Sequence, residues 1–189
     1  MMKYYKYADT EDNYSFVPPG AMIYIETKNG WTIRQLTCGD STIMASNVKH
    51  PRWGLVLPDQ EGDYDSFDEV IPISKEEFDQ IWNAHLQARE PKWNAVKQVH
   101  PVGMDVNGFI EIFYPQGVIV RLGGDALGVA DYQACKASTQ PQFMYSLHKV
   151  TAVVKGYDEI NQWVILDSPQ VHEQKVSYEF AHGNRDGDS

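Results

Sequence analysis

The segment NGFIEIFYPQGVIVRLGGDALGVADYQACK (107–136), followed after a polar loop by MYSLHKVTAVVKGYDEINQWVILDS (144–168), decides the fold of the second half of the chain. Residues 109–114 are rich in β-branched and aromatic side chains, and residues 118–122 resume this pattern after Pro115-Gln116-Gly117. Two such runs around a short break predict a β-hairpin with a three-residue turn.

Three further strands are predicted from the same region. Residues 128–130 form a short apolar run after a glycine-rich turn, and residues 147–157 alternate between apolar and polar side chains, which is the period of a half-buried strand. Residues 162–166 follow a polar turn and close the set. Five short strands, with a long irregular link between the third and fourth, indicate an all-β, five-stranded barrel of the OB type.

Glycines and apolar residues recur in this region in a characteristic order. They are Gly103, Val106, Gly108, the GVIVRL segment at 117–122, Gly128-Val129, the strand and turn at 150–158, and VIL at 164–166. In this order and spacing the second half resembles the OB-fold RNA-binding repeat named after the largest protein of the bacterial small ribosomal subunit. The resemblance implies a small barrel that binds single-stranded RNA.

The positions with which such repeats grip nucleotides differ in this chain. The repeats usually carry aromatic residues on both sides of the glycine that matches Gly117, a histidine after the third strand, and often an arginine at the start of the last strand. The corresponding residues here are Gln116, Ile119, Asp131 and Trp163. Because stacking and positive charge supply most of the affinity for single strands, we interpret this half as the same fold with a changed function.

A β-hairpin is also predicted in the first half. Asn29-Gly30 lies between the apolar runs 22–28 and 31–36, and it is a strong hairpin signal because both turn residues must accept positive φ. Further strands are predicted at 3–7, as an edge strand, at 41–45 and at 53–57.

A helix is predicted to follow these strands. Ser74 can cap its N-terminus, with Glu77 at the capping-box position. Apolar residues recur at helical spacing on one face, at Phe78, Ile81, Trp82 and Leu86, whereas Glu76, Asp79 and Gln80 are predicted to point away. Glu90-Pro91 is predicted to end the helix, because proline disfavours helix in the preceding residue. The first half is therefore predicted to be an α+β domain, an antiparallel sheet with one C-terminal helix.

A second pattern runs through this domain. It consists of Glu26, Gly30-Trp31, Arg34, and Glu76-Glu77-Phe78 with Trp82. In these residues the first half looks like a family of small bacterial proteins of unknown function, which implies a loose association with toxin–immunity loci.

The predicted organisation is thus an α+β domain at 1–90, a link at 92–99, an OB-like β-barrel domain at 97–170, and a flexible tail at 177–189. The oligomeric state, the partner and the arrangement of the two domains are left open by the sequence.

Charge and composition restrict the function. Lys and Arg total 16 against 26 for Asp and Glu, a net charge of −10, which opposes non-specific binding to nucleic acid. The cysteines, Cys38 and Cys135, and the six histidines lack the spacing of a disulfide framework, a metal site or a nucleophile with its base. No stretch has the pattern of a membrane span or a signal peptide. We therefore expect a cytoplasmic protein with no catalytic residues, no metal site and no cofactor.

The most acidic stretch, DQEGDYDSFDE at 59–69, is the first candidate site. It could be a solvated loop, bind a divalent cation, or mimic a nucleic acid toward a basic protein partner. The spacing lacks the glycine and the terminal glutamate of an EF-hand loop, so the cation hypothesis is the weakest. The residues predicted to bind a protein partner are Asp59, Glu61, Asp63, Asp65, Asp68 and Glu69.

A residual RNA-binding face on the barrel is the second candidate site. It would combine stacking and charge from Tyr114, Arg121, Tyr132, Lys149, Lys155 and Trp163. The leading hypothesis from the sequence is a non-catalytic protein that binds another protein in an immunity-like or inhibitor-like role, and the alternative is an RNA-binding regulator.

Overall fold

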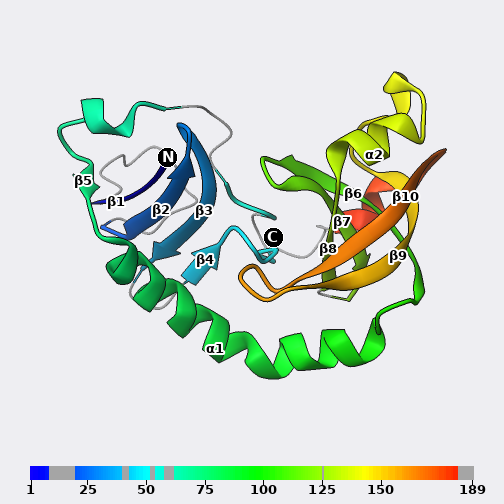
Figure 1. Ribbon diagram of the computed structural model, residues 1–189, viewed down its shortest axis with the longest axis horizontal. Helices are drawn as coiled ribbons and strands as arrows, with labels where there is room; N and C mark the ends of the chain where they lie inside the picture. Colours follow the sequence, from blue (N-terminus) through cyan, green and yellow to red (C-terminus); the bar gives the residue numbers. More distant parts are fainter. Residues whose placement is uncertain (9–19, 40–42, 52–53, 58–61, 125, 183–189) are drawn as a thin grey trace, which may run out of the picture. The chain divides into compact units, whose positions relative to one another are not determined.

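The computed structural model describes residues 1–8, 20–39, 43–51, 54–57, 62–124 and 126–182 (Figure 1). The chain divides into two compact units, Met1–Lys92 and Trp93–Ser189. The long helix α1, Lys75–Val99, begins in the first unit and ends in the second.

The first unit is built on a five-stranded sheet in the order β4-β3-β2-β1-β5, with every neighbouring pair antiparallel. The strands are β1 Met2–Ala8, β2 Met22–Lys28, β3 Trp31–Cys38, β4 Ile43–Ala45 and β5 Ile71–Pro72. The predicted hairpin is confirmed, because β2 pairs with β3 across Asn29 (φ 53°) and Gly30 (φ 86°).

Two strand predictions need correction. β1 is not an edge strand, since β5 pairs with it at Tyr5 and Lys6. Residues 54–57 form no strand beyond an isolated bridge between Gly54 and His50, and Trp53 lies outside the described residues.

The N-terminal cap of α1 is confirmed in part. The Ser74 hydroxyl accepts a hydrogen bond from the Glu77 N–H at 3.1 Å, whereas the Glu77 carboxylate accepts a bond from Lys6 at 2.7 Å instead of completing the capping box. The predicted apolar stripe is also confirmed, because Phe78 and Trp82 are buried against the sheet and Ile81 and Leu86 pack beside them.

The predicted end of this helix at Pro91 is wrong, since α1 continues to Val99. Trp93 is buried, and its indole N–H donates to the Glu159 carboxylate at 2.6 Å, while Val96 packs against the core of the second unit. These contacts offset the N–H that proline removes from the helix. The predicted link at 92–99 is therefore helical.

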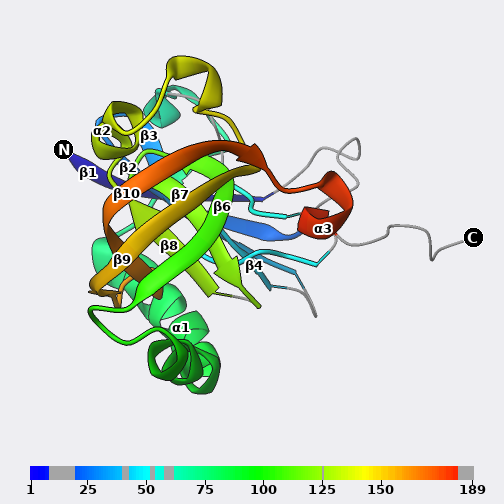
Figure 2. The same ribbon diagram turned by 90° about the vertical axis from the view of Figure 1, so that its right-hand side faces the viewer.

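The second unit is a closed barrel in the order β10-β8-β7-β6-β9, consistent with an OB-like fold (Figure 2). Its strands are β6 Asp105–Tyr114, β7 Gly117–Gly123, β8 Ala126–Ala130, β9 His148–Asp158 and β10 Trp163–Lys175. β8 and β10 pair in parallel, and the other pairs are antiparallel. The turn between β6 and β7 holds two residues and not three, because Tyr114 pairs with Gly117.

Short helices occupy two segments that were predicted to be irregular. The link between β8 and β9 contains α2, Tyr132–Ala137, and the 3-10 helix η2, Pro141–Phe143. Asp131 caps α2, since its carboxylate accepts a hydrogen bond from the Ala134 N–H at 2.7 Å. Residues 178–182 of the predicted tail form α3, Tyr178–His182, and 183–189 lie outside the described residues.

Two glycines of the predicted barrel pattern, Gly108 and Gly117, are required by close packing of the barrel strands. A Cβ on Gly108 would lie 2.3 Å from the Arg121 carbonyl oxygen, and one on Gly117 (φ 145°) would lie 2.4 Å from the Ala130 carbonyl oxygen. Neighbouring backbone leaves no room for a side chain at either position.

Candidate functional site

The described part of the acidic stretch includes the 3-10 helix η1, Tyr64–Ser66, and reaches β5. Asp65 does not face a partner freely, because its carboxylate pairs with Lys3 and accepts a hydrogen bond from the Tyr5 hydroxyl at 2.8 Å. The bonds from Lys3 and then Tyr5 hold the pKa of Asp65 below its ordinary value. Asp65 thus attaches the loop to β1. Asp59 and Glu61 lie outside the described residues.

The remaining acidic residues of the loop, Asp63, Asp68 and Glu69, are exposed. Two apolar side chains are also exposed here: Phe67, which precedes Asp68 and is 54% exposed, and Ile71, which follows Glu69 by two residues and is 51% exposed. We call these five residues the acidic loop surface. Exposed aromatic side chains such as Phe67 are enriched at protein-binding sites relative to the rest of a protein surface.

Three of the six residues predicted to bind RNA are buried or ion-paired within the second unit. Tyr114 and Trp163 are buried, and their ring centroids lie 6.1 Å apart. Arg121 is ion-paired with Glu111 at 3.0 Å and also donates to the Ala181 carbonyl. Burial and ion pairing leave these side chains less surface with which to stack on bases or contact phosphates.

The other three are exposed, one on α2 and two on β9. Tyr132, on α2, is 42% exposed and packs edge-on against Phe113. Lys149 and Lys155 are exposed on β9, where Lys149 donates to Gln174 at 3.4 Å and Lys155 lies 3.7 Å from Asp167. Of the six, Lys155 alone lines the groove that the described residues form on the barrel.

This groove, of about 640 Å³, lies between the turn before β7, the ends of β8 and β9, the β9–β10 loop and the start of β10. Val129 and Ile165, which pair across the parallel strands β8 and β10, provide half-buried apolar surface. Charged residues complete the lining: Asp131, Lys155, Asp158, Glu159 and Asp167. We call this site the barrel groove. Four carboxylates and one ammonium group give its described lining a net negative charge.

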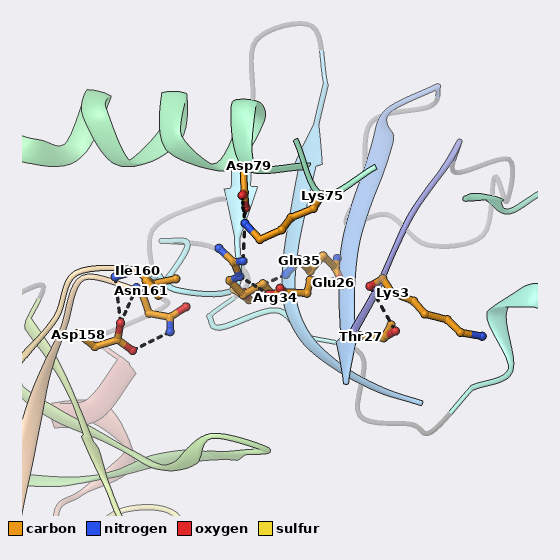
Figure 3. A network of polar contacts seen from close by, with 11 residues as sticks. Lys3, Glu26, Thr27, Arg34, Gln35, Lys75, Asp79, Asp158, Ile160 and Asn161 are labelled. Carbon is orange, nitrogen blue, oxygen red and sulfur yellow. Dashed lines mark hydrogen bonds and ion pairs between the residues drawn. The ribbon is translucent and has the colours of Figure 1, made fainter. Parts of the chain in front are cut away.

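Local hydrogen bonds fix several of these carboxylates. Asp158 accepts bonds from the backbone N–H groups of Ile160 at 3.0 Å and Asn161 at 3.1 Å, which shapes the β9–β10 loop (Figure 3). Glu159 accepts bonds from Trp93 and, at 3.1 Å, from Lys97. Although burial alone would raise it, these two bonds hold the pKa of Glu159 below its ordinary value. The groove is therefore largely formed before any ligand arrives.

Four residues of the second sequence pattern, Glu26, Arg34, Phe78 and Trp82, come together in the first unit, and Figure 3 shows Arg34 beside Glu26 and Asp79. Arg34 pairs with Glu26 and lies 3.8 Å from Asp79, and its guanidinium group stacks over Phe78 and Trp82. The prediction that Asp79 points away from the sheet is therefore wrong. This cluster is a structural element of the core of the first unit.

Sequence reasoning missed the barrel groove because its residues are separated along the chain. Asp131, Asp158 and Asp167 each look like an ordinary turn or cap residue when taken alone. Their proximity depends on the parallel pairing of β8 with β10, which no local pattern encodes.

No protein-family model, no curated protein and no solved structure matched the chain. Within the described residues, no helix has the length and apolar character needed to cross a membrane.

Proposed function

We propose that this protein is a non-catalytic binding protein that holds another protein, in the manner of an inhibitor or immunity protein. The observation that carries the proposal is the acidic loop surface, where Phe67 and Ile71 are each more than half exposed among carboxylates. Exposed aromatic anchors contribute most of the free energy at protein interfaces.

The charges of this surface favour a basic partner. Asp63, Asp68 and Glu69 are exposed, and residues 1–90 carry 15 acidic against 8 basic side chains. Such a field accelerates association with a positively charged protein and disfavours acidic competitors. The attachment of Asp65 to Lys3 and Tyr5 limits the freedom that this loop would lose on binding.

An RNA-binding regulator is the alternative, and the closed five-stranded barrel favours it. Against it stand the ion pair of Arg121 with Glu111 and the burial of Tyr114 and Trp163. We therefore place protein binding first.

Site-specific photo-crosslinking in the native cells tests the proposal. A photoreactive phenylalanine analogue at Phe67 should form a stoichiometric crosslink to one basic protein. The same analogue at Tyr145, which is 61% exposed in the second unit, is the matched control. Changing Asp63, Asp68 and Glu69 to lysine should abolish the Phe67 crosslink. Crosslinks to RNA, equal products from both positions, or no product at Phe67 would overturn the proposal.

A further inference from the structure

The barrel groove combines apolar surface with an acidic lining. Val129 and Ile165 are half-buried, and Ile160 is 60% exposed at its rim. Asp167 and Glu159 are 56% and 60% exposed, so their carboxylates remain accessible to a ligand. The described residues that line the groove all belong to the second unit, so the groove is a different site from the acidic loop surface.

We infer that the barrel groove binds a short segment of a protein that carries an arginine or lysine beside an apolar residue. The cationic group would pair with Asp167, and the apolar neighbour would pack on Val129 and Ile165. This inference stands independently of the acidic loop surface, because the two sites share no residue.

The charge of the groove decides between a protein segment and a nucleic acid. Binding of single strands depends on cations that neutralise phosphates, but the described lining offers one ammonium group against four carboxylates. The same carboxylates complement a guanidinium or ammonium group. A ligand with a phosphate backbone would instead be repelled at Asp131, Asp158, Glu159 and Asp167.

The ion pair between Lys155 and Asp167 must open before a cationic group of the ligand can pair with Asp167. Their charged atoms lie 3.7 Å apart, with the side chains 66% and 56% exposed. An exposed pair at this distance contributes a factor of about five or less to an equilibrium. An incoming arginine can therefore displace Lys155 and make a closer, bidentate contact with Asp167. Lys155 acts as an internal competitor of the ligand.

The size and rigidity of the groove suit a segment of a few residues. A volume of about 640 Å³ lies within the range of sites that bury small ligands. The bonds that hold Asp158 and Glu159 mean that little ordering is needed on binding.

Fluorescence anisotropy on the full chain tests this inference, because two substitutions in the groove should change the affinity for a basic peptide in opposite directions. The probes are a blocked peptide of alternating leucine and arginine, its leucine–glutamate counterpart, and a short single-stranded RNA, all at low ionic strength. Lys155→Ala should tighten binding of the arginine peptide about three- to fivefold, and Asp167→Asn should weaken it by a similar factor. If the groove were a nucleic-acid site, both effects would appear with the RNA and with reversed sign.

Matched control variants distinguish an effect of the groove residues on affinity from an effect of the net charge of the protein. Lys149→Ala alters the same strand as Lys155→Ala, and Glu173→Gln the same strand as Asp167→Asn, yet neither residue lines the groove. Both controls should leave the affinity within about twofold of wild type. Changing Asp63, Asp68 and Glu69 to lysine should also leave peptide binding intact, so failure of the loop proposal and failure of this one give different results.

Two results would overturn the inference. One is no binding of the arginine peptide at about 1 mM, which corresponds to negligible affinity. The other is control variants that shift the affinity as much as the groove variants. Because all four side chains are exposed, unchanged thermal unfolding should verify that each variant is folded.

Discussion

Arg34 and Glu26 form an ion pair inside the first unit, with side chains only 10% and 4% exposed. The guanidinium carbon of Arg34 lies 4.9 Å from the ring centroid of Phe78 and 5.0 Å from that of Trp82. Arg34 thus joins the sheet to α1 through both charge and stacking. The exposed Lys75 pairs with Asp79 at the edge of this cluster.

Replacing Arg34 with alanine should lower the free energy of unfolding by about 3–5 kcal/mol, because the buried Glu26 carboxylate would lose the positive charge that it pairs with. Urea titration followed by circular dichroism measures this. Lys75→Ala removes the ion pair that the exposed Lys75 makes with Asp79 one helical turn further along α1. This variant should lower the free energy of unfolding by less than about 0.5 kcal/mol. Equal losses for the two variants would contradict the structural role assigned to Arg34.

Pro91 lies inside α1, where it is exposed and cannot donate a backbone hydrogen bond. Pro91→Ala should therefore raise the free energy of unfolding, by about 1–3 kcal/mol, because alanine restores the N–H and is the best helix former. Lys92→Ala, at the adjacent exposed position, should change it by only a few tenths of a kcal/mol. A destabilised Pro91→Ala variant would show that the proline conformation is needed there.

Gly108 and Gly156 offer a matched pair of substitutions in the barrel strands β6 and β9. A Cβ at Gly108 would lie 2.3 Å from the Arg121 carbonyl oxygen, whereas a Cβ at Gly156 meets no heavy atom within 4 Å. Gly108→Ala should cost about 1–3 kcal/mol through forced backbone movement, and Gly156→Ala should cost little. Thermal unfolding of both variants would test this, and equal melting temperatures would contradict the close approach of β6 to β7.

His85 should make the stability of the first unit depend on pH. Burial, with a smaller contribution from Arg89, lowers the pKa of His85 to about 4 from its ordinary 6.5, and its Nε2 lies 3.0 Å from the Asn47 Oδ1. Below pH 6.5 the unfolded chain binds a proton at His85 that the folded chain does not. The free energy of unfolding should therefore fall between pH 6.5 and pH 4, by up to about 3 kcal/mol before solvent screening is allowed for.

The comparison that isolates this effect is wild type against His85→Gln, with unfolding measured across the same pH range. The difference in the free energy of unfolding between the two proteins should be constant above pH 6.5. At lower pH the wild type should lose stability relative to the variant. Parallel stability curves would mean that the pKa of His85 does not change on folding and would contradict its burial-lowered value.

Much of the fold could be predicted because its signals are local. Asn29-Gly30 specifies the β2–β3 turn through its backbone preferences, and the spacing of Phe78 and Trp82 specifies one face of a helix. The alternation at 147–157 likewise matches β9, His148–Asp158.

The remaining features depend on contacts between residues that are distant in the chain. Pro91 indicates a helix end unless the bond from Trp93 to Glu159 is known, and that bond spans 66 residues. The groove is equally hidden, because Val129 and Ile165 become neighbours only through parallel strand pairing. The place of Asp131 in the groove is hidden for the same reason: this residue both caps α2 and lines the groove, and only the cap is a local feature of the chain.

Residue-resolved NMR of the isotope-labelled full chain, titrated in parallel with the leucine–arginine peptide and the short RNA, tests protein binding by the barrel most directly. We expect the peptide to shift the amide signals of Val129, Ile165 and Asp167, and the RNA to leave them unchanged. Shifts of these signals with the RNA, without a response to the peptide, would contradict the account.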